Sequence, residues 1–174
     1  MLPPWHEEAI AKKHDRKSFD CGNDEINDFL QRYARQSHEQ GGAKTFLAVD
    51  DGDPKRILGF YSLTPASLVY GRVPRALLKG LARHEVPGFR LARLAIHVDL
   101  QGHGLGGQLI AAAGKRCLMA STEVGGVILV IDAKSDRAAQ WYASYGAIPL
   151  LDTPATLVMA LATFANGLKA TGQL

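Results

Sequence analysis

The feature that most constrains this chain is a run of glycines at the start of a predicted helix. In QGHGLGGQLI, residues 101–110, four glycines fall within six positions, three residues after an apolar strand-like segment at residues 87–98. The first N–H groups of a helix lack intrahelical partners, and the helix dipole adds partial positive charge there. Glycines leave these groups open to an anion such as a diphosphate. One glycine would suffice for a tight turn, so four favour an anion-binding turn.

This segment fits two phosphate-binding patterns, and its context decides between them. GHGLGG satisfies the dinucleotide pattern G-x-G-x-x-G, and Gln101, Gly104 and Gly106 satisfy Q-x-x-G-x-G. A dinucleotide motif follows its strand at once and has an acidic residue at the end of the next strand. Here residues 99–101 intervene, Glu123 precedes the next predicted strand, and too little chain follows for a doubly wound half-sheet. We therefore reject the dinucleotide interpretation.

Hydrophobic periodicity predicts a mixed α/β domain. An amphipathic helix is expected at 23–40, because apolar residues recur every three or four positions between a GND capping sequence and two glycines. The other expected elements are antiparallel strands at 45–50 and 56–70 joined by the turn DDGDP, a short helix at 74–81, a strand at 87–98, a helix at 104–120, a buried strand in GVILVIDA, a helix at 136–145 capped by Ser135, and one or two strands at 148–164. One parallel crossover centres on the glycine turn, and residues 1–174 are expected to form a single domain.

Composition excludes several classes of protein. With 47% hydrophobic and 21% charged residues, the chain is an ordinary globular protein. No apolar run approaches the roughly 20 residues of a membrane span, and the N-terminus lacks the apolar region of a secretory signal. Cys21 and Cys117 fit neither a disulfide framework nor a metal-ligand spacing. We expect buried free thiols in a cytoplasmic protein, with no metal and no membrane partner.

The excess positive charge is concentrated in one stretch, residues 72–93. This stretch carries six basic residues and one acid, Glu85, whereas the rest of the chain carries 14 basic and 16 acidic residues (20 minus 6 and 17 minus 1). A solvated face with a few ion pairs would have this composition. A patch that binds a polyanion would have it too, and both interpretations stay open at this point.

LARLAIHVDLQGHGLGGQLI, residues 91–110, resembles motif A of the GNAT superfamily of acyl-coenzyme A-dependent N-acetyltransferases. The order of predicted elements suits that fold over most of the chain. The resemblance implies an α/β fold whose mixed, mostly antiparallel central sheet is flanked by helices, with a strand–glycine turn–helix cofactor site. It implies that the acetyl-CoA pyrophosphate binds the backbone of the turn, at Gln101, Gly102, His103, Gly104, Leu105, Gly106 and Gly107, with the His103 side chain facing solvent.

The same resemblance pairs the pantetheine arm of acetyl-CoA with the strand before the turn, at Leu94, Ala95 and Ile96. A free strand edge suits an amide-containing arm, because the unpaired N–H and C=O groups of that edge would otherwise need water.

DAKSDRAAQWYASYGA, residues 132–147, resembles the later strand and helix of that superfamily, in which a tyrosine four residues before a glycine points at the thioester sulfur. Tyr142 and Gly146 hold these positions. Amine attack on the thioester releases a thiolate, which a phenol of pKa about 10 can protonate. Tyr142 is therefore the expected general acid, and its aromatic neighbours Trp141 and Tyr145 are expected to pack. Ser135 stands where these proteins often carry a cofactor-contacting asparagine, and Ala147 where a large apolar residue is common.

Three segments together are similar to the GNAT-type toxins of bacterial toxin–antitoxin pairs: FDCGNDEINDFLQRYARQ (19–36), the glycine-turn segment and WYASYGA. That similarity implies acetylation of the α-amine of an aminoacyl-tRNA, which stops translation, with a ribbon-helix-helix antitoxin as partner and a homodimer. A tRNA needs basic side chains for its phosphates, and the expected ones are Arg72, Arg75, Lys79, Arg90 and Arg93. Alternation along its strand could instead turn Arg93 toward the core or a dimer partner.

No carboxylate or histidine stands out in the sequence as a general base. An α-amine, with a reference pKa near 8, is substantially neutral in the cell and can react without one. Two alternatives stay open. The first is a GNAT enzyme for a small amine or a protein terminus, and the second is a non-enzymatic GNAT-like binding module.

Overall fold

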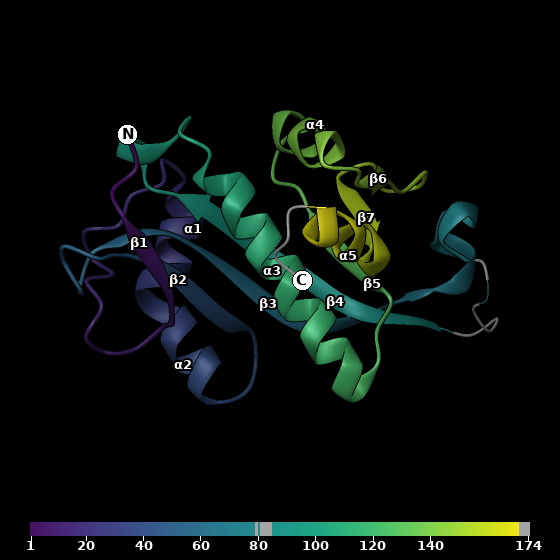
Figure 1. Ribbon diagram of the computed structural model, residues 1–174, viewed down its shortest axis with the longest axis horizontal. Coiled ribbons are helices and arrows are strands. Elements are labelled where there is room, and N and C mark those ends of the chain that lie inside the picture. Colours follow the sequence, from purple (N-terminus) through teal and green to yellow (C-terminus); the bar gives the residue numbers. More distant parts are fainter. Residues whose placement is uncertain (79, 81–84, 171–174) are drawn as a thin grey trace. The chain divides into compact units, whose positions relative to one another are not determined.

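The computed structural model describes residues 1–78, 80 and 85–170. Its seven strands are β1 (Trp5–Ala9), β2 (Lys44–Asp50), β3 (Ile57–Val69), β4 (Glu85–Ile96), β5 (Ile128–Asp132), β6 (Ile148–Pro149) and β7 (Thr156–Ala160). They are hydrogen-bonded in the order β1-β2-β3-β4-β5-β7-β6 (Figure 1). The pairs β1–β2, β2–β3, β5–β7 and β6–β7 are antiparallel and β4–β5 is parallel. The mixed, mostly antiparallel sheet and its parallel crossover are thus as predicted.

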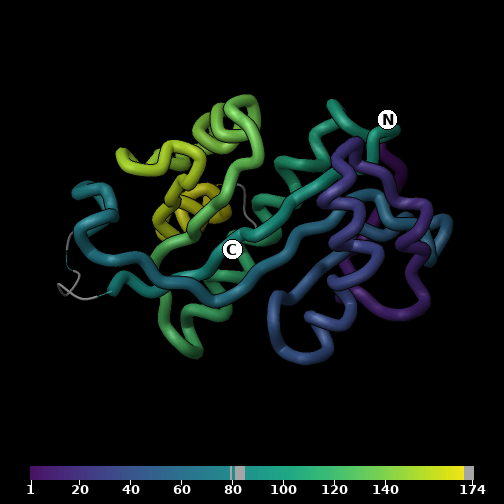
Figure 2. The backbone as a smooth tube through the Cα atoms, turned by 180° about the vertical axis from the view of Figure 1, so that it is seen from behind, coloured from purple at the N-terminus to yellow at the C-terminus, as the bar shows by residue number. Residues whose placement is uncertain are grey.

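The chain divides into two compact units, which the long strands β3 and β4 and the helix α3 (Leu105–Val124) all pass through. The first unit is Met1–Thr64 with Ala92–Ile110, and the second is Pro65–Leu91 with Ala111–Leu174. Figure 2 shows β3 and β4 as neighbouring tubes along much of their length.

The first unit contains the predicted helix at 23–40. It forms as α1 (Asp24–Asp28), a π-helical turn (Phe29–Tyr33) and α2 (Ala34–Glu39). The side chain of Asn23 caps it by accepting a hydrogen bond from the Ile26 N–H at 3.1 Å. A π-helical turn inserts one residue per turn into an α-helix, so it shifts which side chains face the sheet.

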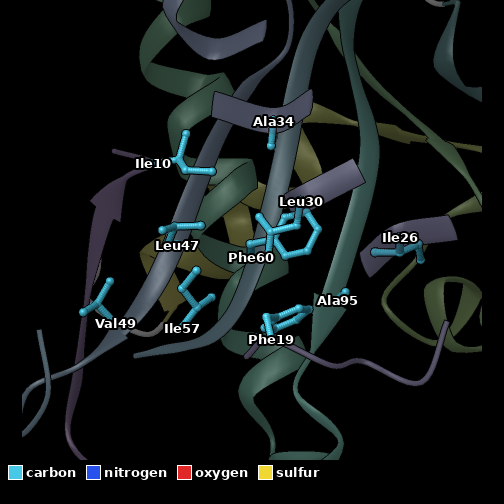
Figure 3. Packing of buried hydrophobic residues seen from close by; sticks show 10 residues of the cluster. All are labelled: Ile10, Phe19, Ile26, Leu30, Ala34, Leu47, Val49, Ile57, Phe60 and Ala95. Carbon is cyan, nitrogen blue, oxygen red and sulfur yellow. The ribbon is translucent and has the colours of Figure 1, made fainter. Parts of the chain in front are cut away.

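The hydrophobic core of this unit lies between these helices and the sheet (Figure 3). Leu30 lies beside Phe60 of β3, and Ile26, Leu30 and Ala34 of the helices belong to one buried cluster with Leu47 of β2. The first turns of α3 lie against the opposite face of the strands, because a Cβ on Gly59 would stand 3.1 Å from Leu109 Cδ1. Gly59 and Phe60 are neighbours in β3, so they face opposite sides of the sheet.

The second unit contains the rest of α3, then β5, α4 (Asp136–Ser144), β6, β7 and α5 (Leu161–Ala170). Parallel pairing joins Gly88–Leu91 of β4 to residues 128–131 of β5. The buried residues of its core cluster come from strands and their connections: Leu68, Val73, Val86, Ile128, Val130, Leu150 and Val158. Helix α3 approaches α5 closely, since a Cβ on Gly114 would lie 2.1 Å from the Phe164 ring.

Two predictions about elements were incomplete or wrong, and one strand was not predicted. The described part of 74–81 contains only a 3-10 turn at Arg75–Leu77 and no longer helix. Residues 161–164 begin α5, whereas a strand was predicted there. The N-terminal strand β1 was not predicted, because its sequence WHEEA lacks the apolar alternation of a half-buried strand.

Neither cysteine forms a disulfide, as predicted, although Cys21 is only partly buried while Cys117 is fully buried. None of the helices in the described part of the chain combines the length and apolar character that crossing a bilayer requires.

Candidate active site

The glycine turn joins β4 to α3 in the first unit. Ile96 ends β4, a 3-10 turn covers Val98–Leu100, and α3 starts at Leu105. Gly102 and Gly104 have φ of 82° and 87°, a region that side chains other than glycine rarely adopt. A Cβ at either position would meet no atom within 4 Å, so both glycines border open space. Gly106 and Gly107 lie in the first turn of α3, where N–H groups lack intrahelical partners.

The side chain of Gln101 holds this turn in place. Its Nε2 donates hydrogen bonds to the carbonyl oxygens of Ile96 at 2.9 Å and Cys21 at 3.0 Å. The amide therefore links the turn to the end of β4 and to the loop before α1. One turn into α3, Gln108 accepts a hydrogen bond from the indole of Trp5 at 3.2 Å. These contacts restrain the turn while its backbone stays available.

The remaining predicted residues of the turn and strand differ in exposure. His103 is exposed, as expected, while the Leu105 side chain is 1% exposed, so only its backbone could face a ligand. The parallel pairing of β4 with β5 ends at Leu91. The predicted pantetheine-binding residues Leu94, Ala95 and Ile96 follow on β4, past the end of this pairing. Leu94 and Ile96 are half-buried and Ala95 is buried.

Gly59 is a residue of this region that was not predicted from the sequence. A Cβ there would stand 2.9 Å from the Ala95 carbonyl oxygen and 3.0 Å from Ile96 Cδ1. The glycine therefore lets β3 approach the end of β4 and the start of α3. An isolated glycine inside a strand pattern signals such an approach, so this signal was present in RILGFYSL, residues 56–63.

Tyr142 lies on α4 in the second unit and is 7% exposed. Burial raises the pKa of its phenol to about 12, so the hydroxyl stays protonated at neutral pH. The Trp141 ring contacts Tyr142 edge-to-face with the ring centroids 4.9 Å apart. Gly146, at φ 101°, ends the helix, and the Ala147 N–H donates to the Tyr142 carbonyl. Burial and the contact with Trp141 therefore restrain the Tyr142 ring.

Ser135 is the N-cap of α4, as predicted. Its Oγ accepts a hydrogen bond from the Ala138 N–H at 3.1 Å. Its predicted contact with the cofactor stays a prediction.

The predicted tRNA-binding residues differ in what they contact. Arg72 forms an ion pair with Asp152 at 3.2 Å, and Arg90 one with Asp132 at 2.5 Å. The Arg93 guanidinium lies 3.7 Å from the centroid of the Phe29 ring, and its pKa is lowered by burial. Arg75 is exposed and makes no ion pair among the residues that the structure describes. Lys79 lies outside the described residues.

In the described ranges, no group of three or more histidine, cysteine or acidic side chains could hold a metal ion. The first unit offers an open backbone turn at a helix start, and the second unit offers a buried, protonated phenol on α4.

A relative from Mycobacterium tuberculosis (strain ATCC 25618 / H37Rv) decides the family. This tRNA-acetylating toxin is 32% identical over 136 residues, which are 78% of this chain and 80% of the relative. The chain belongs to the GNAT-type tRNA-acetylating toxins. A probable toxin TacT of Sinorhizobium fredii (strain NBRC 101917 / NGR234) is 23% identical over 87% of each chain. No protein-family model matches the sequence.

Solved structures of such toxins share the fold. AtaT complexed with acetyl-methionyl-tRNAfMet has a TM-score of 0.88 at 25% identity, over 95% of this chain and 99% of AtaT. A second structure is a tyrosine-to-phenylalanine mutant of AtaT, bound to the C-terminus of the antitoxin AtaR and to acetyl-CoA. Its TM-score is 0.80 at 26% identity, over 94% of this chain and 98% of that chain. The GNAT-type fold expected from the sequence is thereby confirmed.

Proposed function

We propose that this chain is an acetyl-CoA-dependent N-acetyltransferase, a toxin that acetylates the α-amine of an aminoacyl-tRNA and so blocks translation. The observation that carries the proposal is its 32% identity, over 78% of the chain, with a tRNA-acetylating toxin. Its neighbour AtaT, solved with acetyl-methionyl-tRNAfMet, supports the same substrate class.

The glycine turn fits the diphosphate of acetyl-CoA. A Cβ at Gly102 or Gly104 would point into open space, so an anion can approach the backbone there without meeting a side chain. The N–H groups of residues 101–107 and the positive end of α3 then hold the phosphates. Leu94, Ala95 and Ile96 would offer backbone groups to the pantetheine amides, and Ser135 a hydroxyl from the start of α4.

Acetyl-CoA supplies the thioester whose carbonyl carbon the amine attacks. In our proposal Tyr142 donates its phenolic proton to the departing thiolate. With its pKa raised to about 12, the phenol is fully protonated at cellular pH and so has a proton to donate. Such a positioned acid contributes roughly 10² to 10⁴ in rate.

The acceptor amine needs little help from the protein. An α-amine with a reference pKa near 8 is neutral in a substantial fraction of molecules at cellular pH, and after it attacks the thioester a water molecule can take the proton that the nitrogen must lose. A lysine ε-amine, with a pKa of about 10.4, would require a general base. This difference favours an aminoacyl ester over a lysine as substrate.

The basic stretch is the proposed surface for tRNA phosphates. Arg75 is the strongest member, because it is exposed and makes no ion pair within the described part of the chain. Arg72 and Arg90 would bind phosphate while also holding Asp152 and Asp132. Arg93 and Lys79 complete the proposed set. Phosphate contacts of this kind make binding strongly dependent on salt.

We also propose the biological setting that such a toxin requires. The proposed partner is an antitoxin of the ribbon-helix-helix type. The complex of AtaT with the antitoxin AtaR supports an antitoxin as partner, and the ribbon-helix-helix fold is part of our proposal. The enzyme works as a homodimer in the cytoplasm, and residues 1–174 act as one catalytic domain.

Transfer of radiolabel from acetyl-CoA into total charged tRNA tests this function. The expected result is label in the charged pool and none in deacylated tRNA, because only the charged pool carries α-amines. Label that appears in small amines or protein N-termini instead would support the alternative GNAT enzyme. No transfer to any amine would favour a binding module.

A further inference from the structure

One face of α4 presents a cation and two aromatic rings in a row. Arg137 and Trp141 lie one turn apart on α4, and Tyr145, four residues further on, is the C-cap residue of the helix and contacts the Trp141 ring. Arg137 is exposed, Trp141 is half-buried, and Tyr145 is 42% exposed although it is a large aromatic residue. We call these three residues the α4 stripe. Trp141 and Tyr145 were predicted to pack, and their rings are in contact, but Tyr145 also presents much of its ring to solvent.

Trp141 fixes the orientation of the exposed ring. Its ring meets Tyr145 edge-to-face with the centroids 5.0 Å apart, and it meets the proposed acid Tyr142 in the same way at 4.9 Å. One indole therefore braces both tyrosines. A ligand that lies on Tyr145 is held within one helical turn of the residue that we propose to protonate the leaving thiolate.

The charge at the start of α4 favours a polyanion. Lys134 and Arg137 are both exposed, and neither forms an ion pair with another described residue. The acid in this turn, Asp136, lies on the helix at the position beside Arg137, and Gln140 and Ser144 continue its row without charge. A cationic end followed by aromatic rings is the arrangement with which proteins bind single-stranded nucleic acid, through phosphates and stacked bases.

We propose that the α4 stripe stacks a base of the single-stranded 3′ end of the tRNA, with Lys134 and Arg137 on the adjoining phosphates. This inference rests on the proposed function, because the 3′ end carries the aminoacyl group to be acetylated. Stacking on Tyr145 would orient that end beside Tyr142. The stripe thus adds binding of the unpaired end to the phosphate binding that we assign to the basic stretch.

A fluorescent base tests the stacking directly. The probe is an uncharged RNA hairpin with a single-stranded 3′ overhang whose terminal adenine is replaced by 2-aminopurine, which loses fluorescence when it stacks. Full-length protein should quench this probe, and Tyr145→Ala should abolish the quench. Tyr145→Phe should keep it, since the ring remains. Tyr33→Ala is the matched control, because Tyr33 is a 55% exposed tyrosine on the π-helical turn.

Steady-state acetylation of charged tRNA supplies a second readout. Base–aromatic stacking predicts that Tyr145→Ala raises the KM for aminoacyl-tRNA roughly 5- to 100-fold, with little change in the KM for acetyl-CoA. Arg137→Ala should raise the same KM by a smaller factor and reduce its salt dependence. A purely structural effect on Tyr142 would instead lower kcat for Tyr145→Ala and spare the KM.

The outcomes separate this inference from the function on which it rests. If Tyr145→Ala quenches the probe as strongly as Tyr33→Ala does, and has the same KM for aminoacyl-tRNA, the proposed base stacking on Tyr145 is overturned. A Tyr145→Ala protein that binds tRNA normally but changes its oligomeric mass overturns it as well, and marks a protein interface. If wild-type protein acetylates no tRNA but quenches the probe through Tyr145, the stacking surface stands and the proposed substrate fails.

Discussion

The glycine turn before α3 and the helix α4 carry their proposed chemistry on different atoms. At the turn the backbone is exposed, and side chains at Gly102 and Gly104 would only obstruct it. On α4 the proposed reactive group is the hydroxyl of Tyr142, whose side chain is buried and contacts the Trp141 ring. A backbone site is damaged by adding atoms, whereas a side-chain site is damaged by removing them. This difference predicts which substitutions each region tolerates.

The largest effect is expected at the turn. Gly104→Val should abolish measurable acetyl-CoA binding in calorimetry, because the new side chain projects into the space that the diphosphate needs. It also forces valine to a φ of 87°, which costs roughly 1–2 kcal/mol of folding stability.

Gly125→Val is the matched control for that prediction. Gly125 follows the other end of α3 at a φ of 84°, and a Cβ there also meets nothing within 4 Å. Both variants should lose similar stability, while only the Gly104 variant loses acetyl-CoA. Unchanged acetyl-CoA affinity in folded Gly104→Val would show that the turn does not hold the cofactor.

Gly114 within α3 sharpens the comparison with the open glycine turn, because other atoms already fill the space where its side chain would be. A Cβ on Gly114 would lie 2.1 Å from the Phe164 ring, so Gly114→Ala should shift that ring and cost about 1–3 kcal/mol in the free energy of unfolding. The better helix propensity of alanine offsets up to about 1 kcal/mol of this. Urea denaturation measures the difference.

Gly167→Ala in α5 provides the contrast to Gly114→Ala. A Cβ there meets nothing within 4 Å, so only the propensity gain applies and the protein should become slightly more stable. Equal effects at Gly114 and Gly167 would contradict the close contact between α3 and α5.

A smaller effect is expected from the basic stretch. Arg75→Ala should weaken tRNA binding and lower the slope of log affinity against log salt by about 1, since one phosphate contact is lost. Arg72→Ala should do the same and also loosen residues 152–153, because Arg72 contacts Asp152 and Thr153. Filter binding at several salt concentrations measures both. If neither variant changes the slope of log affinity against log salt, the basic stretch is a solvated surface that does not bind tRNA phosphates.

The smallest signal is the ionisation of one phenol. Because burial raises the pKa of Tyr142 to about 12, it should remain mostly protonated at about pH 11, where an ordinary tyrosine is largely ionised. The tyrosinate absorbance of wild type and Tyr142→Phe should therefore nearly coincide at that pH. The same shift means that this group contributes stability below pH 10 that is lost as the pH rises toward 12. If the absorbance of wild type exceeds that of Tyr142→Phe by one whole tyrosinate at about pH 11, the raised pKa of Tyr142 is refuted.

The sequence allowed prediction of features that depend on local spacing. The glycine turn, the Ser135 cap and the helix that carries Tyr142 all follow from residues within a few positions of one another. Long-range contacts were not predictable in this way: Gln101 hydrogen-bonds the carbonyl of a residue 80 positions away. Strand β1 forms because β2 pairs with it, and not because WHEEA has an apolar pattern. Likewise, the pairing of Arg90 with Asp132 depends on the β4–β5 register.

Our central claim is that the turn binds acetyl-CoA while Tyr142 supplies the acid, and Tyr142→Phe tests it most directly. The variant removes one oxygen and keeps the ring that Trp141 braces. Single-turnover transfer of acetyl to charged tRNA should fall roughly 10² to 10⁴-fold, with acetyl-CoA affinity unchanged. Tyr33→Phe, which removes the same oxygen from an exposed ring, should transfer at the wild-type rate. A folded Tyr142→Phe protein with wild-type transfer would contradict the claim.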